Sequence, residues 1–71
     1  MKGHPLLNKH ILWKQHSSND RYFYHYENDR AILLRINNFP DEPLYTIING
    51  LEIFDIEDKP DNWDLQETHP L

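Results

Sequence analysis

The chain has 71 residues, no cysteine, and a net charge of −5 from 12 acidic and seven basic side chains. This length allows one domain, and the lack of cysteine excludes disulfide staples and thiolate metal sites. The start of the chain lacks the apolar stretch of a signal peptide, and no run of residues approaches the roughly 18 apolar residues of a membrane span. We therefore predict a cytoplasmic protein with no membrane partner.

Aromatic and β-branched residues alternate with turn formers through most of the chain, a pattern that predicts β-strands. The connections are a polar Ser-Ser-Asn-Asp turn, a tight turn at Asn28-Asp29, a loop at 38–43 that two prolines stiffen, and a hairpin turn at Asn49-Gly50. Because asparagine and glycine both tolerate positive φ, Asn49-Gly50 is predicted to be a type I′ turn. The predicted strands cover residues 9–16, 21–27, 30–37, 44–48 and 51–57.

Five strands in succession predict the fold class: a mainly β single domain, residues 1–71, built as a small antiparallel meander of four to five strands. A helical turn is predicted near Pro60, because proline suits a first helical position, and residues 66–71 are predicted to be a mobile tail. Both faces of the sheet are largely apolar, whereas a half-exposed sheet alternates apolar and polar residues. The sheet must therefore curl towards a barrel, be covered by the chain's own tails, or bury a face against a second chain. The tails offer four apolar side chains: Leu6, Leu7, Trp63 and Leu65.

Side chains that carry catalysis or hold metals do not form a known motif in this sequence. The histidines lack the spacing of a zinc site, and the acidic stretch at 55–61 lacks the glycine of a calcium loop. With two glycines and few hydroxyl side chains, the sequence contains neither a phosphate loop nor a nucleophile elbow. So short a chain leaves little room for the roughly 300 Å³ cleft of a small-molecule site. These observations predict a protein that is not an enzyme and uses no cofactor or metal.

The charges are unevenly divided along the chain. Residues 1–40 hold six basic and three acidic side chains, whereas residues 41–71 hold nine acidic side chains and one basic one. An acidic field of this kind speeds the capture of a positively charged surface. The leading hypothesis is a small acidic protein-binding domain, such as an inhibitor or immunity-type factor, that docks a basic partner protein. The predicted docking side chains are Asp41, Glu42, Asp55, Asp58, Asp61 and Asp64.

Two alternatives stay open. The first is a nucleic-acid-binding module, because the Tyr22–Tyr26 segment lies between two arginines and is similar in composition to a base-stacking platform. A pI near 5.3 and the lack of a lysine cluster weigh against it, since phosphate contacts supply most of the affinity. The tyrosines would otherwise form a strand face packed against Ile11, Trp13 and Leu33. The second alternative is a homodimer of unknown role.

Two segments, "NFPDEPLYTIING" at 38–50 and "IFDIEDKPDNW" at 53–63, carry a resemblance to other proteins. They resemble small uncharacterised bacterial proteins in which a proline-acid loop precedes an LYT strand, a tight hairpin and an acidic ending with proline and tryptophan. The resemblance covers about a third of the chain. It implies a bacterial origin and a stand-alone small β domain, and it brings no activity and no functional residue.

Overall fold

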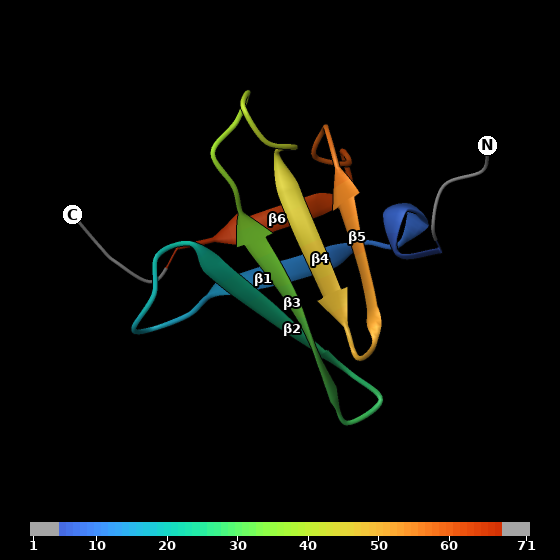
Figure 1. The fold of residues 1–71 in the computed structure, drawn as a ribbon. Helices are drawn as coiled ribbons and strands as arrows, with labels where there is room; N and C mark the ends of the chain where they lie inside the picture. Colours follow the sequence, from blue (N-terminus) through green and yellow to red (C-terminus); the bar gives the residue numbers. More distant parts are fainter. Residues whose placement is uncertain (1–4, 68–71) are drawn as a thin grey trace.

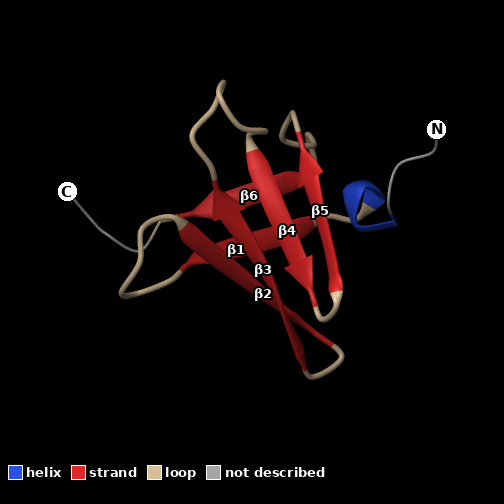
Figure 2. Cartoon of the chain, in the orientation of Figure 1, coloured by secondary structure: helices blue, strands red, loops and turns tan. Residues whose placement is uncertain are grey.

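One six-stranded sheet dominates the computed structural model, which describes residues 5–67 (Figure 1; Figure 2). The first five strands form the predicted antiparallel meander, each within two residues of its predicted bounds. The spatial order is β5-β4-β3-β2-β1-β6, so the sheet is not closed into a barrel. A short 3-10 turn, η1 (Pro5–Asn8), precedes the strands, which are β1 (Ile11–Gln15), β2 (Tyr22–Glu27), β3 (Arg30–Ile36), β4 (Tyr45–Asn49), β5 (Glu52–Ile56) and β6 (Trp63–Gln66).

The sixth strand corrects the predicted fold. β6 pairs in parallel with β1, so the sheet is mixed, whereas a wholly antiparallel sheet of four to five strands was predicted. The helical turn predicted near Pro60 is also wrong: the Trp63 amide donates to the Pro60 carbonyl at 3.1 Å, which closes a turn that leads directly into β6. Gln66 is the last residue of β6, and the remainder of the predicted mobile tail, apart from Glu67, lies outside the described residues.

The sheet folds over on itself, and the core lies between β1 and β6 on one side and β3, β4 and β5 on the other. In Figure 1, β1 and β6 cross behind β3, β4 and β5, and all six strands contribute buried side chains to a single cluster. Trp13 and Trp63 meet edge to face with ring centroids 5.1 Å apart, and the Trp63 Nε1 donates to the Leu6 carbonyl at 3.0 Å. The prediction that the tails cover the sheet is therefore confirmed for Leu6 and Trp63, and the partly buried Leu7 and Leu65 pack against the same core.

The two tight hairpins differ in their turn residues. Asn28 and Asp29 have φ of +54° and +63° and connect the paired residues Glu27 and Arg30, so the predicted tight turn is confirmed. In the other hairpin Asn49 pairs with Glu52, which leaves Gly50 and Leu51 as the turn.

Only the first turn residue of that second hairpin, Gly50, has positive φ, at +64°. This is the φ pattern of a type II′ turn, and the predicted type I′ turn at Asn49-Gly50 is wrong. The observed register pairs apolar residues across the hairpin, Ile47 with Phe54 and Ile48 with Ile53. Such cross-strand pairs stabilise a sheet and decide the register here.

Candidate functional site

The outer face of the sheet, opposite the core, carries a continuous line of apolar side chains. Across β2 to β5 the register aligns Tyr24 with Leu33, Leu33 with Ile48, and Ile48 with Ile53. We call these four residues the apolar row. Its two middle members are half-buried by their neighbours, whereas Ile53 is 64% exposed. The apolar row is therefore a candidate interaction surface.

The tyrosines of β2 extend the apolar row. Tyr22, Tyr24 and Tyr26 lie on the outer face, and the rings of Tyr24 and Tyr26 meet edge to face at 5.6 Å. Tyr26 is 68% exposed. Ile11 and Trp13 lie in the core on the opposite face, so the predicted packing of the tyrosines against them is wrong. Of the three predicted neighbours, Leu33 alone lies beside a tyrosine, Tyr24.

A hollow of about 370 Å³ lies beside Tyr24 and Tyr26. A cavity of about 320 Å³ lies on the inner side of the sheet, next to η1. The expectation that so short a chain has little room for a cleft of small-molecule size is therefore wrong.

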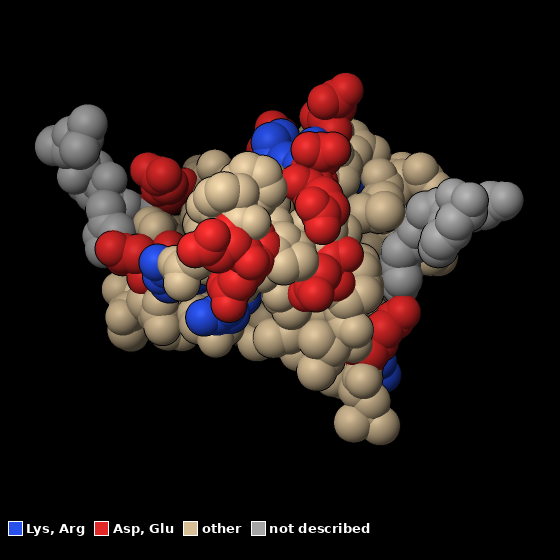
Figure 3. Space-filling model, turned by 45° about the horizontal axis from the view of Figure 1, so that its top comes forward, with Lys and Arg blue, Asp and Glu red and all other residues tan. Residues whose placement is uncertain are grey.

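Four of the six predicted docking acids are in two loops at one end of the sheet. Asp41 and Glu42 belong to the loop between β3 and β4, and Asp58 and Asp61 belong to the loop between β5 and β6. Both loops lie at the top of Figure 1, and Figure 3 shows that Asp and Glu greatly outnumber Lys and Arg on this side of the molecule. All four side chains are exposed.

The other two predicted acids are on strands. Asp55 points outward from β5, where its Oδ1 accepts a hydrogen bond of 2.7 Å from the Thr46 hydroxyl of β4. Asp64 lies on β6, at the opposite edge of the sheet, with its Oδ2 3.3 Å from Nε2 of His10. The structure thus brings five of the six acids to one region, which we call the acidic rim: Asp41, Glu42, Asp55, Asp58 and Asp61.

A hydrogen-bonded chain ties the acidic rim to the sheet. Asn37 is 7% exposed, and its Nδ2 donates to the Pro43 carbonyl at 3.1 Å and to the Thr46 hydroxyl at 2.7 Å. Its Oδ1 accepts a bond of 2.6 Å from Arg35. Because buried polar groups are costly unless they are hydrogen-bonded, this satisfied amide fixes the loop that carries Asp41 and Glu42. Sequence reasoning missed Asn37, whose only signal is its position at the start of the proline loop.

The nearby arginines do not neutralise the acidic rim. Arg21 donates to the Ile36 carbonyl at 3.0 Å and to the Asn38 side-chain oxygen at 2.9 Å. Arg35 donates to Asn37. Between residues 5 and 67 no ion pair joins a lysine or arginine to an acid of the rim. Ion pairs among the described residues therefore leave the negative charge of the rim uncompensated.

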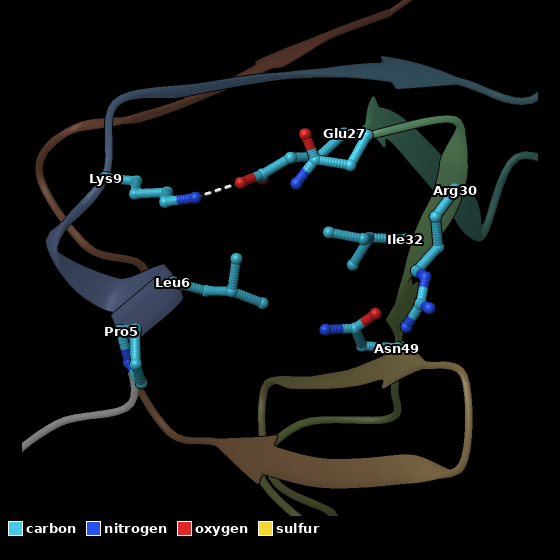
Figure 4. Close-up of a pocket in the computed structure, with 8 residues that line it drawn as sticks. Pro5, Leu6, Lys9, Glu27, Arg30, Ile32 and Asn49 are labelled. Carbon is cyan, nitrogen blue, oxygen red and sulfur yellow. Dashed lines mark hydrogen bonds and ion pairs between the residues drawn. The ribbon is translucent and has the colours of Figure 1, made fainter.

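The inner cavity next to η1 contains a different kind of site (Figure 4). Lys9 forms an ion pair with Oε2 of Glu27, and the two residues are 18 positions apart in the sequence. The hydrogen bond and the positive charge of Lys9 lower the pKa of Glu27 below its ordinary value of 4.5, against a smaller opposing effect of burial. Glu27 is thus held as a carboxylate at the mouth of the cavity.

No protein-family model, curated protein or solved structure matches this chain. The resemblance to small bacterial proteins therefore stays a prediction. In the described part of the chain, no three histidine or acidic side chains are grouped so that they could hold a metal ion. The same residues contain no helix with the length and apolar character needed to cross a membrane.

Proposed function

We propose that this protein is a small cytoplasmic protein-binding domain that docks a basic partner through the outer face of its sheet. The apolar row carries the proposal, because it crosses four strands on a face that no described strand or helix packs over. Protein interfaces combine an apolar and aromatic centre with a polar rim. Here the row and Tyr26 supply the centre, and the acidic rim supplies the charged border.

The acidic rim favours a basic partner over a second copy of the chain. Two copies that met through this face would bring like charges together, which opposes association. A basic surface would gain electrostatic attraction and a faster encounter. The same field repels phosphate groups, so it weighs against the rival proposal that the tyrosines of β2 bind nucleic acid. Inhibitor or immunity-type factors, which capture a basic enzyme or toxin, have this chemistry.

The test begins with partner capture from a native lysate and continues with binding kinetics of the purified pair. We expect the combined change Asp41→Asn, Asp58→Asn and Asp61→Asn to slow association about tenfold or more at low salt, with the difference shrinking as salt rises. Ile53→Ser is expected to speed dissociation instead. Asp29→Asn, in the β2–β3 turn at the end of the sheet away from the rim (Figure 1), is the matched control and should leave both rates unchanged.

Three results would contradict the proposal. The first is binding that ignores both salt and the triple change. The second is salt-sensitive retention of DNA or RNA that depends on Tyr24 and Tyr26, which would favour the nucleic-acid module. The third is a tight dimer in sedimentation with no other partner, which would favour the homodimer.

A further inference from the structure

The cavity next to η1 is built from three separate segments and has two chemically different walls (Figure 4). We call it the η1 cavity. Its volume of about 320 Å³ falls in the range of small-molecule sites. Pro5, Leu6 and Ile32 make its apolar wall. The polar wall comes from the segment between η1 and β1, the β2–β3 turn with its flanking residues, and the end of β4, with Lys9, Glu27, Asn28, Arg30 and Asn49.

Two acceptor atoms of the polar wall lack a donor. Oε1 of Glu27 and Oδ1 of Asn49 are buried and have no hydrogen-bond partner. Nε2 of His25 lies 3.7 Å from the Glu27 atom, which is too long for a hydrogen bond. Unpaired buried acceptors are rare in folded proteins, because the loss of water is not compensated. An N–H or O–H group of a water molecule or of a ligand in the cavity can donate to these two atoms.

Arg30 brings a positively charged hydrogen-bond donor to the same cavity. Its guanidinium lines the η1 cavity and lies near the Gly50 turn, with Nη1 3.7 Å from where a Cβ would stand on that glycine. No carboxylate within residues 5–67 pairs with it. Lys9, the other cation of the cavity, is already paired with Glu27. Arg30 is thus the group available for an anion, and a guanidinium binds a carboxylate through two parallel hydrogen bonds.

We propose that the η1 cavity binds a small carboxylate that carries a neutral N–H group beside it and an aliphatic side chain. This is the chemistry of an N-acylated amino acid and of the last residue of a peptide. The carboxylate pairs with Arg30, the N–H group donates to Asn49 or Glu27, and the side chain packs on Leu6 and Ile32. A neutral donor fits better than an ammonium group, because the Lys9 ammonium already occupies Glu27 and like charges repel.

This site lies on the inner side of the sheet, at the end away from the acidic rim, so it does not depend on the proposed docking function. The probe is N-acetyl-L-leucine, titrated into the full chain labelled with ¹⁵N and followed by amide chemical shifts. We expect saturable shifts confined to the cavity, including Ile32 and Asn49. Arg30→Met should weaken binding about tenfold or more, since hydrogen bonds between charged groups are the strong ones. Lys14→Met, on the outer face, is the matched control and should bind as the parent does.

Chemical analogues test each contact separately. N-acetyl-leucine amide lacks the carboxylate, 4-methylpentanoate lacks the N–H group, and each is expected to bind about tenfold more weakly or worse. A tetrapeptide that ends in leucine assigns the site to peptide C-termini if it binds more tightly than N-acetyl-leucine, and to a small molecule if it does not. If Arg30→Met fails to fold, Arg30→Lys replaces it, with a smaller expected loss because lysine keeps the charge without the fork.

Three outcomes would overturn the proposal. One is the absence of any shift at about 10 mM N-acetyl-leucine, which lies beyond the weak end of specific binding. Another is equal binding of the acid and its amide, which would remove the role of Arg30. The third is tighter binding of free leucine than of N-acetyl-leucine, which would show that the cavity prefers an ammonium group.

Discussion

Trp63 connects β6 to the core, and its removal should take away a large share of the stability of the domain. The side chain is 0% exposed, meets Trp13 edge to face, and donates to the Leu6 carbonyl. Truncation of a buried large aromatic residue to alanine typically costs about 3–5 kcal/mol. A domain of this length has a total stability of about 4–11 kcal/mol, at 0.05–0.15 kcal/mol per residue. Trp63→Ala is therefore expected to remove between about a quarter of this stability and all of it.

Urea unfolding followed by far-ultraviolet circular dichroism measures this loss without depending on tryptophan fluorescence. Trp63→Phe separates the ring from its N–H group and should lose less, because an apolar ring remains in the core. Asp64→Ala is the matched control on the same strand, and since its side chain points outward it should stay within about 0.5 kcal/mol of the parent. A loss below about 1 kcal/mol for Trp63→Ala would refute the reasoning, because such values are typical of exposed sites and not of core aromatic residues.

Three further predictions concern the hairpins and the Lys9–Glu27 pair. Gly50→Val should lower the free energy of unfolding by about 1–2 kcal/mol, because a residue with a Cβ is strained at this positive φ even though the Cβ itself has room. Thermal melting identical to the parent would contradict this. Asp29→Gly should raise the melting temperature, because glycine adopts the positive φ of this position without that strain, whereas Leu51→Gly, where φ is not positive, should not. The lowered pKa of Glu27 means that its pairing with Lys9 stabilises the fold fully above pH 4.5 and that this contribution is lost as the pH falls through the folded pKa. Glu27→Gln should therefore flatten the acid limb of a stability–pH curve, and an unchanged limb would contradict it.

The first five strands were predictable because their signals are local. Alternating side chains and turn residues decide a strand and its ends without reference to the rest of the chain. The turn at Gly50-Leu51 was misplaced by one residue, because Asn49-Gly50 is the stronger turn signal in isolation. Pairing of Ile47 with Phe54 outweighed that signal.

β6 was not predictable in the same way. It has four residues, and its partner β1 lies about 50 positions earlier in the chain. A parallel pair has no hairpin turn to indicate it, and its connection runs through the whole meander. Pro60 favoured a helix start in sequence terms, whereas the burial of Trp63 beside Ile11 decided the outcome.

The candidate sites also differ in how far the sequence alone could predict them. The acidic half of the chain was visible as a count of charges, and it predicted the members of the acidic rim. It could not predict that Asp64 lies at the opposite edge, since that depends on β6. The η1 cavity had no signal at all, because Lys9, Glu27 and Asn49 come together only when η1 and the sheet have formed.

The outer face gives the strongest physical argument for a partner. Both tryptophans lie on the inner side of the sheet, where they and the buried aliphatic residues form the core. A chain of 71 residues has no further element within its described part to cover the second side of the sheet. The apolar row nevertheless keeps leucine and isoleucine at Leu33, Ile48 and Ile53, where polar residues would satisfy the strands equally well. The apolar side chains on this face and the acidic rim beside them are therefore the two observations that support the proposed docking of a basic partner.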